Sequence, residues 1–175
     1  MEDTTISIVG IVMAASLMFL VPLILIADRA DDIAQLIVQT RTAEFVNEIV
    51  KSGKITKDQY QKFLDQLLSS GNTYEIDMEI KILDQNTAKI GNNNTYYSIF
   101  TSQIENILTK SGQDIGDEIE GTLILKQGDV ISLTVKNSSK TLSQSLKNFY
   151  YNIAGSDIQI IAATASGTVA INGTR

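Results

Sequence analysis

The sequence has no cysteine, no histidine and no tryptophan, and only one proline among its 175 residues. The first two absences exclude Cys- or His-ligated zinc, His- or Cys-ligated haem, a Ser-His-Asp triad and a thiolate nucleophile. The chain therefore has no disulfide, but many Gram-positive surface proteins also lack disulfides, so this absence does not indicate a cytosolic protein. We therefore expect no enzyme, no catalytic residues, and no cofactor or metal.

Positive charge is also scarce, with 14 Lys and Arg against 20 Asp and Glu and a net charge of −6. No basic stripe is present, so a nucleic acid partner is not expected. Glycine-rich phosphate-binding motifs are missing as well, and we expect no small-molecule substrate. The densest acidic stretch, Gly112 to Gly121, lacks EF-hand spacing, and we interpret it as a solvated loop instead of a calcium site.

One long stretch carries no charge at all. The 23 residues from Thr5 to Ala27 would form a helix about 34 Å long, enough to cross a hydrocarbon core of about 30 Å. A cleaved secretory signal and a buried soluble helix are the alternatives. The acidic start at Glu2 and Asp3, the length of the run and the lack of an A-x-A site favour an uncleaved anchor or a pilin-type helix. Charge does not decide the orientation, because Arg29 is the only nearby basic residue.

Small residues and one proline stand out inside this run. Gly10 and Ala14 are one helical turn apart and offer a place where another helix can approach closely. The alternative is that small residues are simply common in membrane helices. Pro22 cannot donate to the carbonyl of Met18, which predicts a kink or local melting. A helical bundle or filament would supply a partner for that carbonyl, and a tolerated kink in an ordinary anchor is the alternative.

The helix is predicted to continue beyond the membrane. A polar turn, Asp28–Asp32, precedes an amphipathic stretch that runs to Ser52, and Gly53 is a favourable residue just after a helix end. The domain organisation that we expect is therefore a transmembrane or assembly segment at 1–30, an amphipathic continuation at 31–53 and an α+β head at 54–175.

Two short helices of the head begin with the same signature. Thr56-Lys-Asp-Gln59 and Thr141-Leu-Ser-Gln144 both have the form of a capping box. Between them, the stretch from Tyr74 to Ile82 alternates apolar and charged residues, which predicts a strand packed on one face only. An Asn-rich loop over 84–95 and a helix that includes Ile99 are predicted to follow.

The remaining strands lie in the second half of the head. Thr122–Leu125 and Val130–Lys136 predict a hairpin with a turn at Lys126–Asp129. The last strand, Ile158–Ile171, is predicted to be weakened or bulged at Ser166–Gly167. We therefore expect an α+β fold with a long, partly transmembrane N-terminal helix. Its small head has three shorter helices and a mostly antiparallel sheet of about four strands.

Several stretches together resemble a known family. They are Val21–Asp32, Phe45–Tyr60 with its continuation to Gly71–Ile76, Gln127–Asp129 and Ser166–Val169. On these residues the chain resembles the TadE-like minor pilins, or pseudopilin-like proteins, of Tad-type (type IV pilus-related) systems in Gram-positive bacteria. The resemblance implies an N-terminus on the cytoplasmic side and a head outside. It also implies extraction into a pilus or short pseudopilus, or a role in starting its assembly.

The chain departs from this family at one position. Type IV pilins usually have a glutamate at the fifth mature position, whereas this chain has Thr5, with Glu2 and Asp3 nearby. No basic leader precedes Met1, so either the numbering starts near the mature end or the subunit is not processed in that way. We expect a structural subunit that contacts membrane lipid and copies of itself or other pilin-like subunits. A membrane-anchored extracellular binding or sensing module is the alternative.

Overall fold

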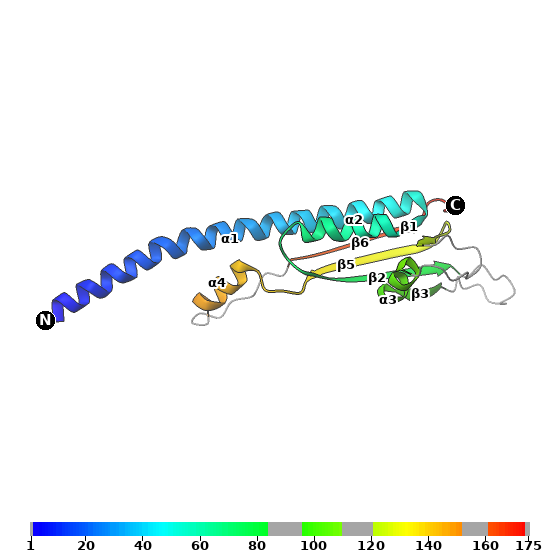
Figure 1. The fold of residues 1–175 in the computed structure, drawn as a ribbon. Helices are drawn as coiled ribbons and strands as arrows, with labels where there is room; N and C mark the ends of the chain where they lie inside the picture. The colour runs from blue at the N-terminus through cyan, green and yellow to red at the C-terminus, as the bar shows by residue number, and fades with distance from the viewer. Residues whose placement is uncertain (1, 84–95, 110–120, 152–160, 174–175) are drawn as a thin grey trace. The chain divides into compact units, whose positions relative to one another are not determined.

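The structure is a computed structural model that describes residues 2–83, 96–109, 121–151 and 161–173 (Figure 1). It confirms the predicted fold class, with a long apolar N-terminal helix, three shorter helices and an antiparallel sheet of four strands among the described residues. The elements in chain order are α1 (Glu2–Ser52), β1 (Lys54–Thr56), α2 (Lys57–Leu68), β2 (Tyr74–Leu83), β3 (Tyr96–Phe100), α3 (Thr101–Thr109), β4 (Thr122–Ile124), β5 (Val130–Asn137), α4 (Leu142–Tyr151) and β6 (Ala162–Thr168).

The chain divides into two compact units, which we describe separately. The anchor unit comprises Met1–Ala34 and Lys140–Gln159, and the sheet unit comprises Gln35–Ser139 and Ile160–Arg175. Helix α1 contributes its first part to the anchor unit and its second part to the sheet unit. The Asn-rich loop and most of the acidic stretch that the sequence predicts lie outside the described residues.

Helix α1 begins at Glu2 and stays helical through Pro22 to Ser52. Local melting at Pro22 is therefore not observed. The end of the helix lies where the sequence predicts it, because Gly53 has a φ of 66° and donates its amide hydrogen to the carbonyl of Ile49 at 2.8 Å. That left-handed conformation is costly for a residue with a Cβ atom.

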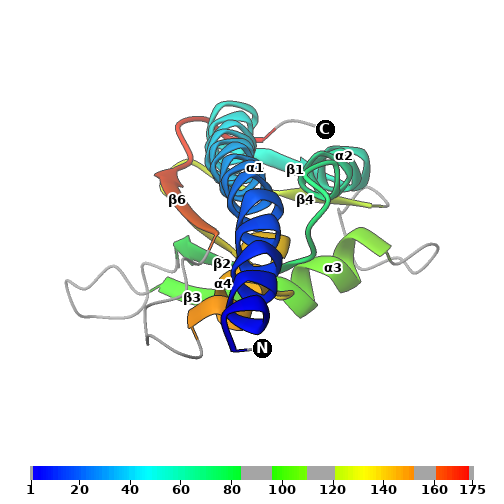
Figure 2. The same ribbon diagram turned by 90° about the vertical axis from the view of Figure 1, so that its left-hand side faces the viewer.

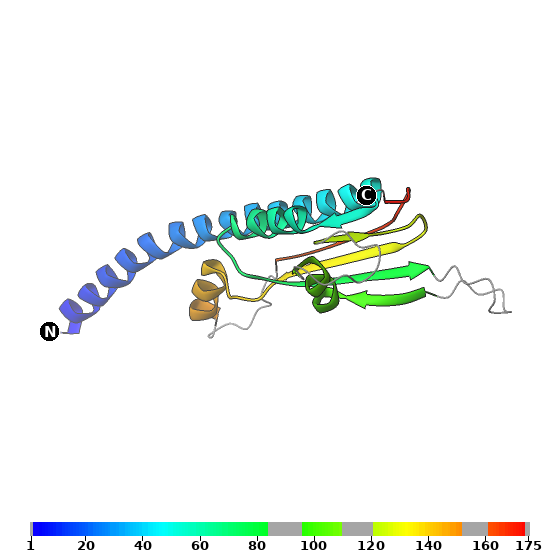
Figure 3. The same cartoon turned by 45° about the vertical axis from the view of Figure 1, so that its right-hand side comes forward.

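The sheet has the strand order β3-β2-β5-β6, and all neighbouring strands are antiparallel. The register pairs Met78 with Leu133 and Leu133 with Ala165, so alternate residues of the strands share a face. Met78 and Ile80 are buried and Glu75 and Asp77 are exposed, which confirms the predicted half-buried strand. The second part of α1 and helix α2 lie side by side along one face of the sheet (Figures 1–3).

Aromatic packing joins α2 to α1. The ring of Phe45 on α1 stacks on Phe63 of α2 with a centroid distance of 4.4 Å, and Tyr60 lies against the same ring at 6.4 Å. Helix α2 starts where the sequence predicts, since Thr56 and Gln59 form both hydrogen bonds of a capping box. The cap fixes the start of α2 and so brings its apolar face onto α1.

The predicted hairpin is wrong in its pairing. The turn at Lys126–Asp129 exists, with a 3.1 Å hydrogen bond between its ends, but β4 does not pair with β5. It pairs with β1, a strand that the sequence did not predict, because the chain reversal at Gly53 lays residues 54–56 beside 122–124. The fourth place in the main sheet is taken by β3, which contains Ile99, a residue predicted to be helical.

The predicted bulge in the last strand is also wrong. Ser166 and Gly167 pair regularly with Ser132 and Ile131 in β5. Gly167 has a different role, since a Cβ atom at this position would lie 2.7 Å from the side chain of Val50 on α1. The glycine therefore permits close packing of α1 on β6. A small residue is needed here for that contact, and the strand is not interrupted.

Candidate functional site: an exposed apolar helix segment

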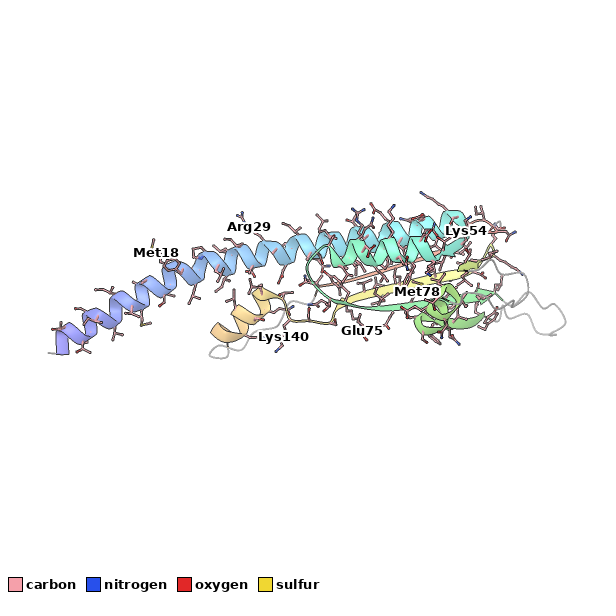
Figure 4. All side chains as sticks on the ribbon, viewed as in Figure 1. Met18, Arg29, Lys54, Glu75, Met78 and Lys140 are labelled. Atoms are coloured by element: carbon pink, nitrogen blue, oxygen red, sulfur yellow. The ribbon has the colours of Figure 1, made fainter. Side chains whose placement is uncertain are left out.

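The most unusual surface of the molecule is the apolar segment, which we define as residues 6–26 of α1. Helix α1 is long and apolar enough to cross a membrane, and none of its most apolar stretch is buried within the described structure. Met18 and Phe19 are 78% and 80% exposed, and Met18 extends away from the helix (Figure 4). Soluble monomers rarely expose a contiguous apolar surface of this size.

The apolar character surrounds the helix. Leu17, Met18 and Phe19 are consecutive, so their side chains leave the axis in directions about 100° apart, and all three are exposed. A helix that is hydrophobic on every side requires an apolar environment on every side. The described residues of this chain do not provide one, which leaves the segment as a candidate membrane span.

The residues that the sequence singled out lie along this segment or just before it. Thr5, Gly10, Ala14 and Pro22 are all exposed on α1, and a Cβ atom placed on Gly10 would meet nothing within 4 Å. Glu2 opens the helix and Asp3 follows it, and their side chains are outside the described part of the structure. No contact with the described part of the chain requires a small residue at Gly10.

The polar turn that follows the apolar segment makes hydrogen bonds that the sequence did not predict. The carboxylates of Asp28 and Asp31 accept hydrogen bonds from the hydroxyl groups of Ser143 and Thr141, the second at 2.7 Å. These hydroxyl groups belong to the first turn of α4 and to the residue before it. The capping box at Thr141 predicted the start of this helix and is confirmed by both of its hydrogen bonds, at 3.1 and 3.2 Å. Nothing in the sequence indicated that Asp28 and Asp31 of α1 lie beside the start of α4.

The sheet unit has a second feature on the polar face of its sheet. An open pocket of about 540 Å³ is lined by residues of β2 and β5, the end of β3 and the start of α3: Asp77, Met78, Glu79, Phe100, Thr101, Ser102, Ser132 and Thr134. Beside it, Ser98 donates a 2.7 Å hydrogen bond to Glu79. Figure 4 shows Glu75, on the same face, extending outward. The lining combines carboxylates, hydroxyl groups and one exposed ring.

One of the described titratable groups has a clearly shifted pKa. Burial, with a smaller contribution from a 2.7 Å hydrogen bond to the carboxylate of Glu105, raises the pKa of the Tyr60 hydroxyl above its usual value. This contact links α2 to α3 and is structural in character. Among the described residues, no group of three or more acidic side chains is arranged to hold a metal ion.

Comparison with known proteins does not assign the chain to a family. No family model, no curated protein and no solved structure matches it.

Proposed function

We propose that this chain is a pilin-like or pseudopilin-like structural subunit of a type IV or Tad-related pilus or secretion apparatus. In this proposal the chain is not an enzyme. It resides in the membrane through the apolar segment, with its head on the extracytoplasmic side, and assembles with copies of itself or other pilin-like subunits on the cell surface.

The observation that carries the proposal is the contrast within α1. Residues 6–26 are mostly apolar and, apart from the half-buried Leu20 and Ile24, exposed, whereas the later residues Phe45, Val46 and Ile49 are buried within the sheet unit. The apolar segment of such a helix can move from lipid into contact with neighbouring helices while the sheet unit stays folded. The resemblance of Val21–Asp32 and Phe45–Tyr60 to TadE-like pilins supports the same reading.

Assembly is tested by changing the small residues of the segment. Gly10→Leu and Ala14→Leu should abolish incorporation into sheared surface fibres, because larger side chains prevent close approach of a neighbouring helix. Val12→Leu is the matched control, since it adds a similar side chain at an exposed position that is already large. Immunogold electron microscopy and fractionation provide the readout. Normal fibres from the Gly10→Leu and Ala14→Leu variants would refute assembly through this patch.

A second test addresses the acidic start of the helix. Changing Glu2 and Asp3 to Lys should block assembly while the head keeps its thermal unfolding curve. Retention of the variant in the membrane fraction separates an assembly defect from a failure of anchoring. Unchanged fibre assembly by the double variant would count against a role for this end in subunit contacts.

The pocket on the polar sheet face favours one alternative, a membrane-anchored binding module. Carboxylate and hydroxyl groups beside the exposed ring of Phe100 suit a polar ligand such as an oligosaccharide. A glycan array probed with the full chain in micelles tests this function, with Asp77→Ala and Ser132→Ala as the variants that should lose binding. Saturable binding in the absence of any fibre would favour the module over the subunit.

A further inference from the structure

Helix α4 is attached to α1 by polar contacts. Asp31 accepts a hydrogen bond from Thr141, and Asp28 accepts one from Ser143. Both aspartates lie in the first polar turn after the apolar segment, and this part of α1 belongs to the anchor unit together with α4. These bonds hold the start of α4 at the boundary between the apolar and the polar parts of α1. Figure 1 shows α4 starting beside α1 at this level.

The contact with α1 uses the polar side of α4. Ser143 is only 2% exposed, whereas the neighbouring Leu142 is 62% exposed. By helical spacing, Leu142 and the half-buried Leu146 occupy one stripe of α4, and Ser143 lies about 100° from Leu142. A helix that packs on a soluble domain normally turns such a stripe inward. Here its first residue is directed away from α1.

The position of this stripe indicates what covers it. If residues 6–26 span a bilayer, the turn containing Asp28 and Asp31 lies in the headgroup layer, and the hydrogen bonds place the start of α4 in the same layer. Arg29 and Lys140 are exposed near this turn, and both point outward (Figure 4). Asp32 is exposed as well, so charges of both signs are available to a zwitterionic headgroup layer. Short amphipathic helices with leucine and phenylalanine on one face bind at this depth.

We propose that α4 is an interfacial helix whose Leu142–Leu146 face lies on the phospholipid surface, held there by Asp28 and Asp31. This inference rests on the membrane-spanning part of the proposed function. It adds a second membrane contact at residues 142–146 to the span itself. The occupant of the exposed stripe is then lipid and not another protein.

The absence of tryptophan allows a direct test. Single-tryptophan variants of the full chain are reconstituted in phosphatidylcholine vesicles with bromine atoms placed either close to the headgroups or deep in the acyl chains. Leu142→Trp reports on the exposed stripe, and Asn148→Trp reports on another side of the same helix. Phe19→Trp reports on the span, and the exposed Thr164→Trp on β6 serves as the aqueous control.

The expected pattern is specific. Emission of Leu142→Trp should fall at least two-fold with shallow bromines and less with deep ones, and Asn148→Trp should be quenched less than Leu142→Trp. Phe19→Trp should respond most strongly to deep bromines, and Thr164→Trp should not respond to either lipid.

Other outcomes separate the two proposals. Quenching of Phe19→Trp without quenching of Leu142→Trp would overturn the role of α4 and leave the membrane span intact. Blue-shifted but unquenched emission from Leu142→Trp would show that protein covers the stripe, and would also overturn it. If Phe19→Trp is not quenched, the span itself fails and the inference about α4 fails with it.

Discussion

The two halves of α1 are one continuous helix in two different environments. In the first half, Met18 and Phe19 are highly exposed, and a Cβ atom added at Gly10 would meet no described atom within 4 Å. In the second half, Val38 and Ile49 have no exposed surface, because α2 and the sheet cover them. Both halves are α-helical, so the difference arises from what surrounds each half. The second half thus contributes to the stability of the fold, whereas in the proposed function the first half acts in the membrane or an assembly.

The sharpest way to break this comparison is to truncate the same residue type in each half. Phe45→Ala should lower the free energy of unfolding of the sheet unit by about 4 kcal/mol, because it removes a ring stacked on Phe63 and leaves a cavity. Phe19→Ala should change it by less than about 0.5 kcal/mol. Urea unfolding of the full chain in micelles, followed by circular dichroism, measures both. Equal losses would show that the two halves are not energetically separate.

The next largest loss of stability is expected at Gly53, just after the buried half of α1. Gly53→Ala should cost about 3 kcal/mol, since the residue has a positive φ and its Cβ atom would lie 2.5 Å from the amide nitrogen of Gly173. Gly71→Ala is the matched control, with a φ of 79° and nothing within 4 Å, and should cost only about 1 kcal/mol. The same unfolding measurement applies. A similar cost for both variants would mean that backbone conformation alone matters at Gly53.

A buried carboxylate sharpens the comparison, because both of its backbone donors belong to the sheet unit itself. Asp129 is 2% exposed and accepts hydrogen bonds from the amides of Leu83 and Lys126 at 2.9 and 2.8 Å. Asp129→Ala should destabilise the sheet unit by about 2–3 kcal/mol, because two donors lose a charged acceptor. Hydrogen exchange at these two amides measures the effect locally. Unchanged protection would contradict the role of Asp129.

The smallest expected effect depends on pH. The raised pKa of Tyr60 favours the neutral phenol in the folded state, so its contribution is complete below about pH 10, the usual tyrosine pKa. It decreases as the pH rises above that value, because the unfolded chain then releases its proton first. Tyr60→Phe should cost about 1 kcal/mol at pH 8 and reduce the loss of stability between pH 9 and pH 11. An unchanged slope would assign that loss to other groups.

The sequence predicted much of the local structure. The length and uncharged character of residues 5–27, the two capping boxes and the alternation over Tyr74–Ile82 depend on residues close together in the chain, and the structure confirms the elements that they predict. The pairing of β4 with β1 was missed, because three-residue strands carry little periodicity and their partners are distant in sequence. The role of Gly167 was missed because its cause is the side chain of Val50 on another element.

The same division holds for the candidate site. The sequence by itself determined an apolar rod at the N-terminus, since hydrophobicity and charge are properties of the residues and not of their arrangement. Only the tertiary structure decided that α4 starts on Asp28 and Asp31 and leaves Leu142 exposed. Hydrogen bonds between residues more than a hundred positions apart leave no pattern in a single chain, because either partner is an ordinary polar residue until folding brings the two together.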